Sequence, residues 1–328
     1  QQKAQVFSME PNAAVRSRLT HSLEVSQVGR YLADEITQQL GPSRLNDLQQ
    51  GALVNFVETA CLMHDIGNPP FGHFGEAAIQ EWFKKHGTKC VLNSMDLDEK
   101  AAPSYAAPLN LALADFFQFD GNPQGLRIVS RLQWNTDAFG LNLTKTTLAA
   151  FLKYVRSSQE EPSERAFTKK PGYFFSELDV VREVWDEFGY TGGPQRFPLA
   201  YIMEAADDIA YCVSDLEDSF EKGIVQEDNA FPEIQRRYDQ RGFTSSAPCH
   251  GDIAEVLQKM VLAAQAGDFS NFTYTDFRTR INSIIVRYVA ARYVSKEAEI
   301  EAGTLKSLLP EEEPPGAILK VLKEFCRD

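Results

Sequence analysis

The sequence predicts an all-α protein, and three observations support that fold class. Apolar residues recur at spacings of three and four over long stretches, which is the period of an amphipathic helix. No segment alternates apolar and polar residues over a useful strand length. Glycine and proline fall between the periodic segments, where they separate one helix from the next.

The helical segments are bounded by residues that interrupt helices. Gly41 ends the first segment, and Pro69 and Pro70 keep the residues before the third non-helical. The polar stretches 89–108 and 157–172 are expected to be exposed loops. The predicted helices lie at about residues 20–40, 53–63, 73–85, 109–119, 124–134, 145–156, 198–222, 250–266, 275–298 and 315–326.

The composition of the 328 residues is that of a globular protein. A hydrophobic content of 43% suffices for a core, and no stretch approaches the roughly 18 uninterrupted apolar residues that a membrane span needs. No charged-then-apolar leader opens the sequence, so we expect a soluble, cytoplasmic protein without a membrane partner. A formal net charge of −13 disfavours broad attraction to nucleic acid or anionic lipid. Five scattered cysteines without a C-x-x-C pair argue against a disulfide framework or a thiolate zinc site.

Two histidines and two aspartates are candidate metal ligands. His64-Asp65 places an imidazole beside a carboxylate at the predicted end of a helix, where a turn lets both reach one ion. His21, near the start of the first helix, and Asp207, within the helix at 198–222, supply two further donors. This mixed set suits Mn²⁺, Fe²⁺, Co²⁺, Ni²⁺ or, less strongly, Mg²⁺, and zinc is not favoured. The alternative is that these polar groups at helix ends pair with one another.

The helix at 198–222 carries a polar stripe. Asp207, Tyr211 and Asp215 recur every four residues and therefore share one face. Because an unpaired buried charge costs several kcal/mol, carboxylates on a helix with an apolar side need a cation or a polar ligand. The alternative is a solvated face with salt bridges.

Three short runs occur in a fixed order along the chain. They are RLTHS at residues 18–22, HDIGNPPFGHFGE at 64–76 and EAADDI at 204–209. Together they resemble the HD-domain phosphohydrolases, and more narrowly the bacterial deoxyguanosine triphosphate triphosphohydrolase group. The similarity extends over most of the first 220 residues. It implies an HD-domain helical core with additional C-terminal helices, divided into a catalytic core at 1–225 and a helical C-terminal region at 226–328.

The resemblance also implies a cofactor and a reaction. One divalent metal ion would be held by His21, His64, Asp65 and Asp207. The substrate would be a deoxynucleoside triphosphate, cleaved at its α-phosphorus into the deoxynucleoside and intact inorganic triphosphate. The ion would polarise an α-phosphoryl oxygen or the attacking water.

His73 and Glu76 match the catalytic pair of that family. Their i, i+3 spacing lets the carboxylate orient the imidazole on one helical turn. We expect protonated His73 to act as general acid toward the departing 5′ oxygen, with Glu76 fixing its tautomer. His73 as base or nucleophile is the other possibility, and a structural histidine is the alternative without chemistry.

Further residues match substrate contacts of the family. Those expected at the phosphates are Arg18, Lys153, Tyr154 and Lys170. Those expected at the sugar are Tyr211, whose ring would exclude a 2′-hydroxyl, and Asp215, which would accept from the 3′-hydroxyl. Gln5, Val6 and Asn122 are expected to line the sugar and base pocket. A preference for dGTP follows from the resemblance alone.

Two other functions are alternatives to a triphosphohydrolase. A related enzyme could hydrolyse another nucleotide, such as a nucleoside monophosphate or a guanosine polyphosphate. A nucleotide-sensing or single-stranded-DNA-binding regulatory module belongs to a different class, but the complete ligand set argues against a dead site. The resemblance further implies a homo-oligomer, and single-stranded DNA as an effector.

Overall fold

The structure is a computed structural model that describes residues 17–134, 137–164, 166–190, 195–267 and 271–326. By the contacts between their residues, these segments form two compact units. The first unit contains residues 17–62 and 201–326, and the second contains residues 63–200, apart from the gaps just given. Each unit has its own hydrophobic core.

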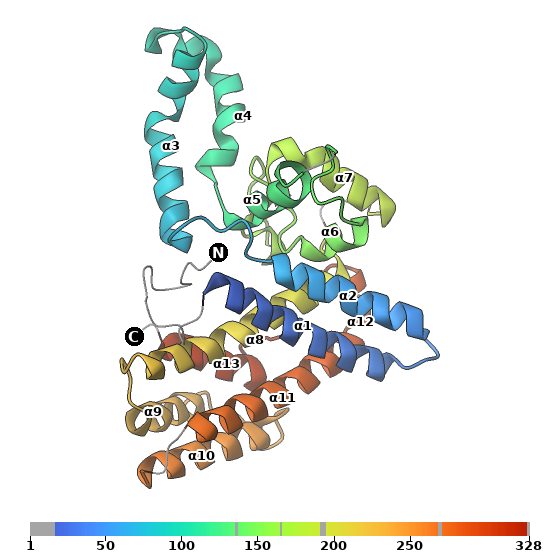
Figure 1. Cartoon of the computed structure of the whole chain (residues 1–328), viewed down its shortest axis with the longest axis vertical. Helices are drawn as coiled ribbons and strands as arrows, with labels where there is room; N and C mark the ends of the chain where they lie inside the picture. The colour runs from blue at the N-terminus through green and yellow to red at the C-terminus, as the bar shows by residue number, and fades with distance from the viewer. Residues whose placement is uncertain (1–16, 135–136, 165, 191–194, 268–270, 327–328) are drawn as a thin grey trace. The chain divides into compact units, whose positions relative to one another are not determined.

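The first unit is built from helices (Figure 1). Helix α1 begins with a capping box, in which Ser17 and Thr20 bond each other's backbone amides, and it ends before Gly41, whose φ is 75°. Helix α11 buries Phe277 and Ile281 at helical spacing and packs along α1. The helices of this unit are α1 (Arg18–Leu40), α2 (Asp47–Met63), α8 (Pro198–Glu221), α9 (Glu227–Asp239), α10 (His250–Gln265), α11 (Asn271–Ser295), α12 (Glu297–Glu301) and α13 (Pro314–Phe325).

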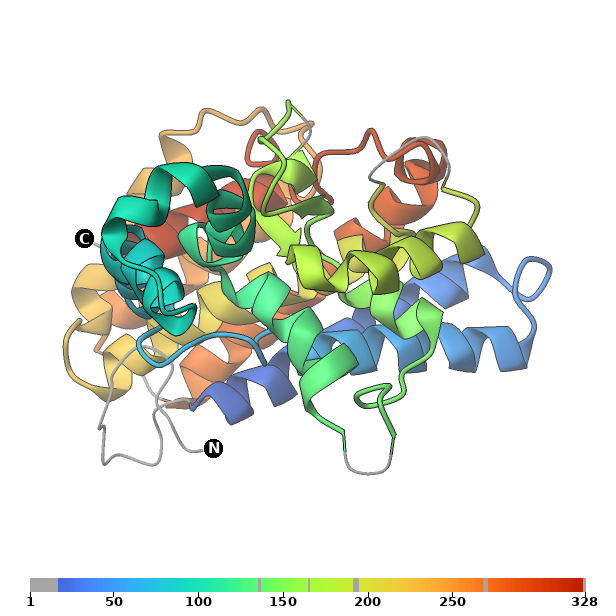
Figure 2. The ribbon, with the colours of Figure 1, turned by 90° about the horizontal axis from the view of Figure 1, so that it is seen from above.

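The second unit combines shorter helices with a two-stranded parallel sheet, β1 (Arg156–Ser157) and β2 (Pro171–Tyr173). Helices α3 and α4 lie side by side, and Figure 2 views them along their length. The helices are α3 (Gly72–Ser94), α4 (Ala106–Phe117), α5 (Gly121–Arg127), α6 (Lys145–Phe151) and α7 (Leu178–Glu187). A π-helical stretch, Ile128–Leu132, continues α5, and 3-10 turns lie at Glu99–Tyr105, Ala166–Thr168 and Phe175–Glu177.

A buried arginine organises the sheet of the second unit. The guanidinium of Arg156 donates hydrogen bonds to the carbonyl oxygens of Thr168 and Glu160 and to the side-chain oxygen of Gln118. Since a buried charge is tolerated only when its donors are satisfied, these bonds fix the segment between β1 and β2. That segment leads directly into Lys170.

The predicted all-α class is confirmed, and most predicted helices are present at close to the predicted bounds. Several predictions were wrong in detail. The third helix continues to Ser94 rather than ending near residue 85, so the predicted loop at 89–108 is largely helical. The helix at 145–156 ends at Phe151, and the predicted loop at 157–172 contains strand residues. Helices α7 and α9 were not predicted.

The boundary predicted at residue 225 was drawn where the sequence motifs end, and it stays a prediction. The compact units are delimited elsewhere, near residues 62 and 200. Among the described residues, no helix combines the length and apolar character that crossing a membrane requires.

Candidate active site

The first candidate ligands lie on α1 and α8. His21 is on the first turn of α1 and is 1% exposed. Its Nε2 lies 3.5 Å from Oδ1 of Asp207, which is held on α8 beside the buried side chains of Ala206 and Ile209. Because α8 is amphipathic, it places the Asp207 carboxylate beside His21, which is buried.

His64 and Asp65 follow the last residue of α2 directly. The chain turns there, since the amide of Ile66 bonds the carbonyl of Met63 at 2.9 Å and the amide of Asn68 bonds that of Asp65 at 3.1 Å. His64 Nε2 lies 3.5 Å from Asp65 Oδ1. The pair begins one residue after Met63, the last residue of α2.

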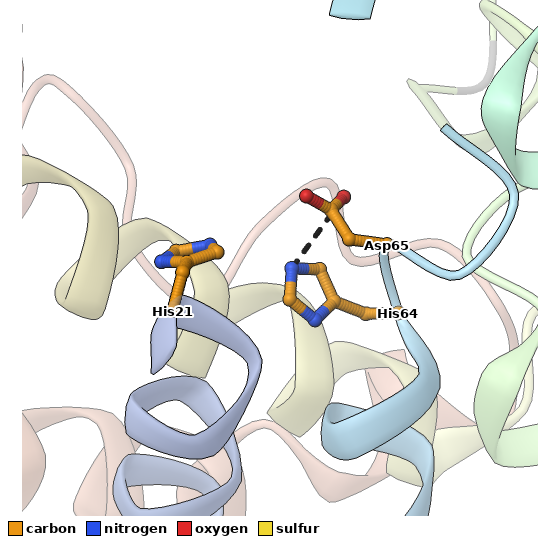
Figure 3. Close-up of side chains that lie close together, drawn as sticks. All are labelled: His21, His64 and Asp65. Atoms are coloured by element: carbon orange, nitrogen blue, oxygen red, sulfur yellow. Dashed lines mark ion pairs between the residues drawn. The ribbon is translucent and has the colours of Figure 1, made fainter. Parts of the chain in front are cut away.

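His21, His64 and Asp65 form one cluster (Figure 3). One ligand atom from each lies within 4.8 Å of the others. Two imidazoles and a carboxylate at such distances fit a divalent first-row ion, which imidazole and carboxylate ligands suit. Asp207 contacts the cluster through His21. The predicted four-ligand set thus has three members grouped together and the fourth beside one of them.

The two sugar-site candidates lie on the next turns of α8. The Tyr211 ring meets the His21 ring edge-on, with 6.4 Å between centroids, and the Lys323 ammonium lies 5.4 Å from the Tyr211 ring centre. Burial raises the pKa of Asp215 to about 6, and a hydrogen bond with Tyr211 opposes that rise while Asp218 adds to it. Above pH 6 the Asp215 carboxylate is an acceptor.

The predicted catalytic pair is present at the start of α3 in the second unit. Phe71, with φ of 67°, and Gly72, with φ of 55°, turn the chain into the helix. His73 Nδ1 and Glu76 Oε2 are 2.6 Å apart. The His73 side chain is 84% exposed, and the Glu76 side chain is only 8% exposed. The imidazole therefore faces solvent, while the carboxylate that contacts it is buried.

A short turn before α5 supports this pair. The amide of Gly121 donates to Oε1 of Glu76 at 2.8 Å, so both oxygens of that carboxylate are engaged. Asp120 caps α5 by accepting from the amide of Asn122 at 3.0 Å, and it also accepts from the Asn122 side chain at 2.6 Å. The Lys170 ammonium lies 2.8 Å from the other oxygen of Asp120.

These groups border a pocket of about 400 Å³ in the second unit. Three lysines contribute to its wall, which suits a polyanion. Among its residues, only His73, Glu76 and Lys170 are predicted site residues. The residues that line the pocket are His73, Glu76, Ala77, Gln80, Lys84, Phe117, Gln118, Asp120, Lys169, Lys170 and Pro171.

Asp120 was not among the predicted site residues. An aspartate immediately before Gly-Asn-Pro is a typical helix N-cap, and that signal was present in the sequence. What the sequence did not contain was the distance to Lys170, which is fifty residues further along the chain.

The remaining substrate-site candidates lie on other elements. Arg18 is the first residue of α1 and is half-buried. Lys153 and Tyr154 follow α6 and are half-buried, and a Cβ on Gly172 would lie 1.6 Å from the Tyr154 carbonyl oxygen, so that contact requires glycine. Gln5 and Val6 lie outside the described residues.

Comparison with known proteins agrees with the cluster. The HD domain model matches residues 18–131. A probable deoxyguanosinetriphosphate triphosphohydrolase of Pseudomonas aeruginosa is 39% identical, over 100% of this chain and 67% of that protein. This chain belongs to the deoxyguanosinetriphosphate triphosphohydrolase family of HD-domain proteins.

Further members of the family support the assignment. The deoxyguanosinetriphosphate triphosphohydrolases of Enterobacter sp. strain 638 and Salmonella typhimurium are each 38% identical to this chain, over 95% of its length. The chain spans 64% of each of these two relatives. The family resemblance found in the three sequence motifs is thereby confirmed.

Proposed function

We propose that this protein is a metal-dependent deoxynucleoside triphosphate triphosphohydrolase with dGTP as its preferred substrate. The observation that carries the proposal is the grouping of His21, His64 and Asp65 within 4.8 Å, with Asp207 beside His21, in a chain of this family. Such donors suit one divalent ion of the series Mn, Mg, Co, Ni or Fe. When bound, the ion would supply Lewis-acid polarisation of a phosphoryl oxygen or water.

His73 and Glu76 are proposed as the proton-handling pair. The Glu76 carboxylate accepts a hydrogen bond from the Gly121 amide and contacts His73 Nδ1. It therefore keeps a proton on Nδ1 of His73 and leaves Nε2 of that imidazole facing solvent. An imidazolium there can give its proton to the departing 5′ oxygen, whose release as an alkoxide is costly. The 84% exposure of the His73 side chain leaves it accessible to a substrate.

The remaining contacts follow from charge and shape. Lys170 borders the pocket beside His73 and is proposed to bind phosphate, together with Arg18, Lys153 and Tyr154. Tyr211 and Asp215 are proposed at the deoxyribose, with Asn122, Gln5 and Val6 lining the sugar and base. Because the whole chain carries a net charge of −13, the substrate's negative charge must be met by these local cations and the metal.

Product analysis tests the reaction. Each of the four dNTPs and GTP is incubated with the protein and Mn²⁺, and nucleoside, inorganic triphosphate and diphosphate are separated by ion-exchange chromatography. We expect deoxyguanosine and intact triphosphate in equal amounts, little reaction with GTP, and none with His64→Ala. His86→Ala, a histidine on α3 outside both clusters, is the matched control and should retain activity.

Other products would identify another function. Release of diphosphate or orthophosphate, or hydrolysis of a monophosphate or a guanosine polyphosphate, would replace this proposal with another HD hydrolase activity. Nucleotide binding without any product would favour a regulatory module.

A homo-oligomer and an effect of single-stranded DNA on the rate are proposed by analogy with the family. Analytical ultracentrifugation tests the first, and assays with added oligonucleotide test the second.

A further inference from the structure

Asp120 occupies an unexpected position for an acidic residue. It is 6% exposed, and it lies in the wall of the pocket that also contains Lys84, Lys169 and Lys170. A buried carboxylate opposes the binding of a polyanion in the same pocket by like-charge repulsion. If the pocket served anion affinity alone, an asparagine would cap α5 equally well and remove that repulsion.

The contacts of Asp120 divide between its two oxygens. Oδ1 accepts from the backbone amide and the side-chain amide of Asn122, at 3.0 and 2.6 Å. Oδ2 is 2.8 Å from the ammonium of Lys170. Because the Asn122 bonds fix the carboxylate, the carboxylate in turn fixes the end of a long, flexible lysine side chain.

The pair also keeps the lysine charged. Burial by itself would lower the pKa of the Lys170 ammonium, but the Asp120 carboxylate, with smaller contributions from Glu76 and Tyr154, opposes burial, and the pKa is raised above its ordinary value. Lysine has three donors. One is directed to Asp120, so two remain for phosphate oxygens.

The backbone of the same turn reaches the catalytic pair. Gly121 donates to Glu76, and a Cβ on Gly121 would lie 1.9 Å from the side-chain oxygen of Asn68, so the turn is packed closely against the segment that follows the His-Asp pair. Asp120 therefore belongs to the closely packed turn whose next residue, Gly121, donates a hydrogen bond to Glu76. The position of Lys170 relative to His73 depends on that turn through Asp120.

We propose that Asp120 is a positioning residue for the hydrolysis, which orients the Lys170 ammonium toward the phosphates at some cost in anion affinity. This inference rests on the proposed function, because it assigns Lys170 to the phosphates. It predicts that removing the negative charge of Asp120 lowers turnover without weakening the binding of inorganic triphosphate. A purely structural role would impair both.

Asp120→Asn tests the inference. Asparagine keeps the oxygen that accepts from Asn122, but its amide group cannot accept from the Lys170 ammonium. We expect kcat for dGTP to fall 10- to 100-fold, since small displacements of a binding group have effects of that order. The Kd for inorganic triphosphate, measured by calorimetry in metal-free buffer, should stay within threefold of wild type or decrease.

A double-mutant cycle isolates the lysine. Lys170→Gln should lower kcat and weaken triphosphate binding, and Asp120→Asn added to it should lower kcat by less than threefold further, because Asp120 acts through Lys170. An equal effect of Asp120→Asn in both backgrounds would overturn the inference. So would an unchanged kcat in the single variant, or a triphosphate Kd raised more than threefold.

Two controls complete the experiment. Glu187→Gln breaks an exposed lysine pair of the same unit, in which Lys145 Nζ lies 3.0 Å from Glu187 Oε2, and it should change neither quantity. If Asp120→Asn does not fold, Asp120→Glu retains the charge but displaces it, and it should lower kcat at unchanged triphosphate Kd. Should the wild-type protein show no triphosphohydrolase activity, the proposed function fails and the inference fails with it. An active wild type whose Asp120→Asn variant keeps its kcat overturns the inference alone.

Discussion

At the scale of single residues, Asp215 shows how burial and function oppose each other. Its pKa is raised to about 6, first by burial and then by Asp218, whereas the Tyr211 hydrogen bond, His21 and Lys323 act in the opposite direction. A carboxyl group with a raised pKa binds more protons in the folded chain than in the unfolded one. The free energy of unfolding therefore falls as the pH rises from about 4 to about 6, and it stays lower above that range.

Asp215→Asn removes this penalty and keeps an acceptor for Tyr211. In metal-free buffer we expect the free energy of unfolding to rise by roughly 3 kcal/mol at pH 7.5 and to be unchanged near pH 3.5. Urea denaturation at both pH values measures the difference. Asp186→Asn, at an exposed site on α7, should change stability by less than about 0.5 kcal/mol at either pH. A gain of equal size at both pH values would contradict the explanation.

Glu76→Gln tests the proton-handling pair. Glutamine can still accept from the Gly121 amide, but it cannot stabilise an imidazolium at His73 as a carboxylate does. We expect kcat to fall about 100-fold or more, with KM and the melting temperature nearly unchanged. Steady-state kinetics and a thermal melt measure these quantities, and Glu81→Gln on the exposed face of α3 is the control. A kcat within threefold of wild type would exclude Glu76 from the reaction.

At the scale of elements, the spacing of apolar residues predicted the long helices well. It failed to predict helical residues in segments that are polar or contain proline. Residues 86–94 extend α3 although they are polar, because they pack beside α4. Helix α9 contains Pro232 and few apolar residues, yet its Phe231 and Ile234 are fully buried. Tertiary packing decides such cases, and a single sequence does not contain it.

Two glycines illustrate the difference between local and tertiary constraints. Gly67 follows the His-Asp pair, and a Cβ there would lie 2.0 Å from the carbonyl oxygen of Gly121 and 2.2 Å from the amide nitrogen of Gly125. Gly51 lies within α2 and has no atom within 4 Å of such a Cβ. Only the structure separates them, since either could be read as a helix-associated glycine.

The two glycines should respond oppositely to alanine. Gly67→Ala forces the backbone of α5 to move, so we expect stability to fall by roughly 2–3 kcal/mol. Gly51→Ala should raise stability by about 1 kcal/mol, because alanine favours the helix. Chemical denaturation of both variants beside the wild type makes the comparison. Destabilisation by Gly51→Ala, or tolerance of Gly67→Ala, would show that the close approach is absent.

At the scale of the whole molecule, sequence motifs predicted which residues carry chemistry better than how they are supported. His21, His64 and Asp65 were selected from two of the three short runs and are grouped in the structure. Asp120 and Gly121 were not selected, because their roles depend on partners 45 to 50 residues away in sequence, Glu76 and Lys170. Chain topology creates those contacts, and local pattern does not reveal them.

A bound metal should stabilise the whole molecule, because the ligands come from α1, from the end of α2 and from α8. An ion that binds only the folded chain adds RT ln(1 + [M]/Kd) to the free energy of unfolding, about 2.7 kcal/mol at 100 times Kd. For a chain of this size, this gain in the free energy of unfolding corresponds to a rise in melting temperature of several degrees.

We expect Mn²⁺ to raise the melting temperature of the wild type and EDTA to reverse the rise. His64→Ala and Asp207→Asn should abolish it, whereas His86→Ala should retain it. An equal rise in all four proteins would mean that Mn²⁺ acts elsewhere on this acidic chain, and the ligand set would have to be abandoned.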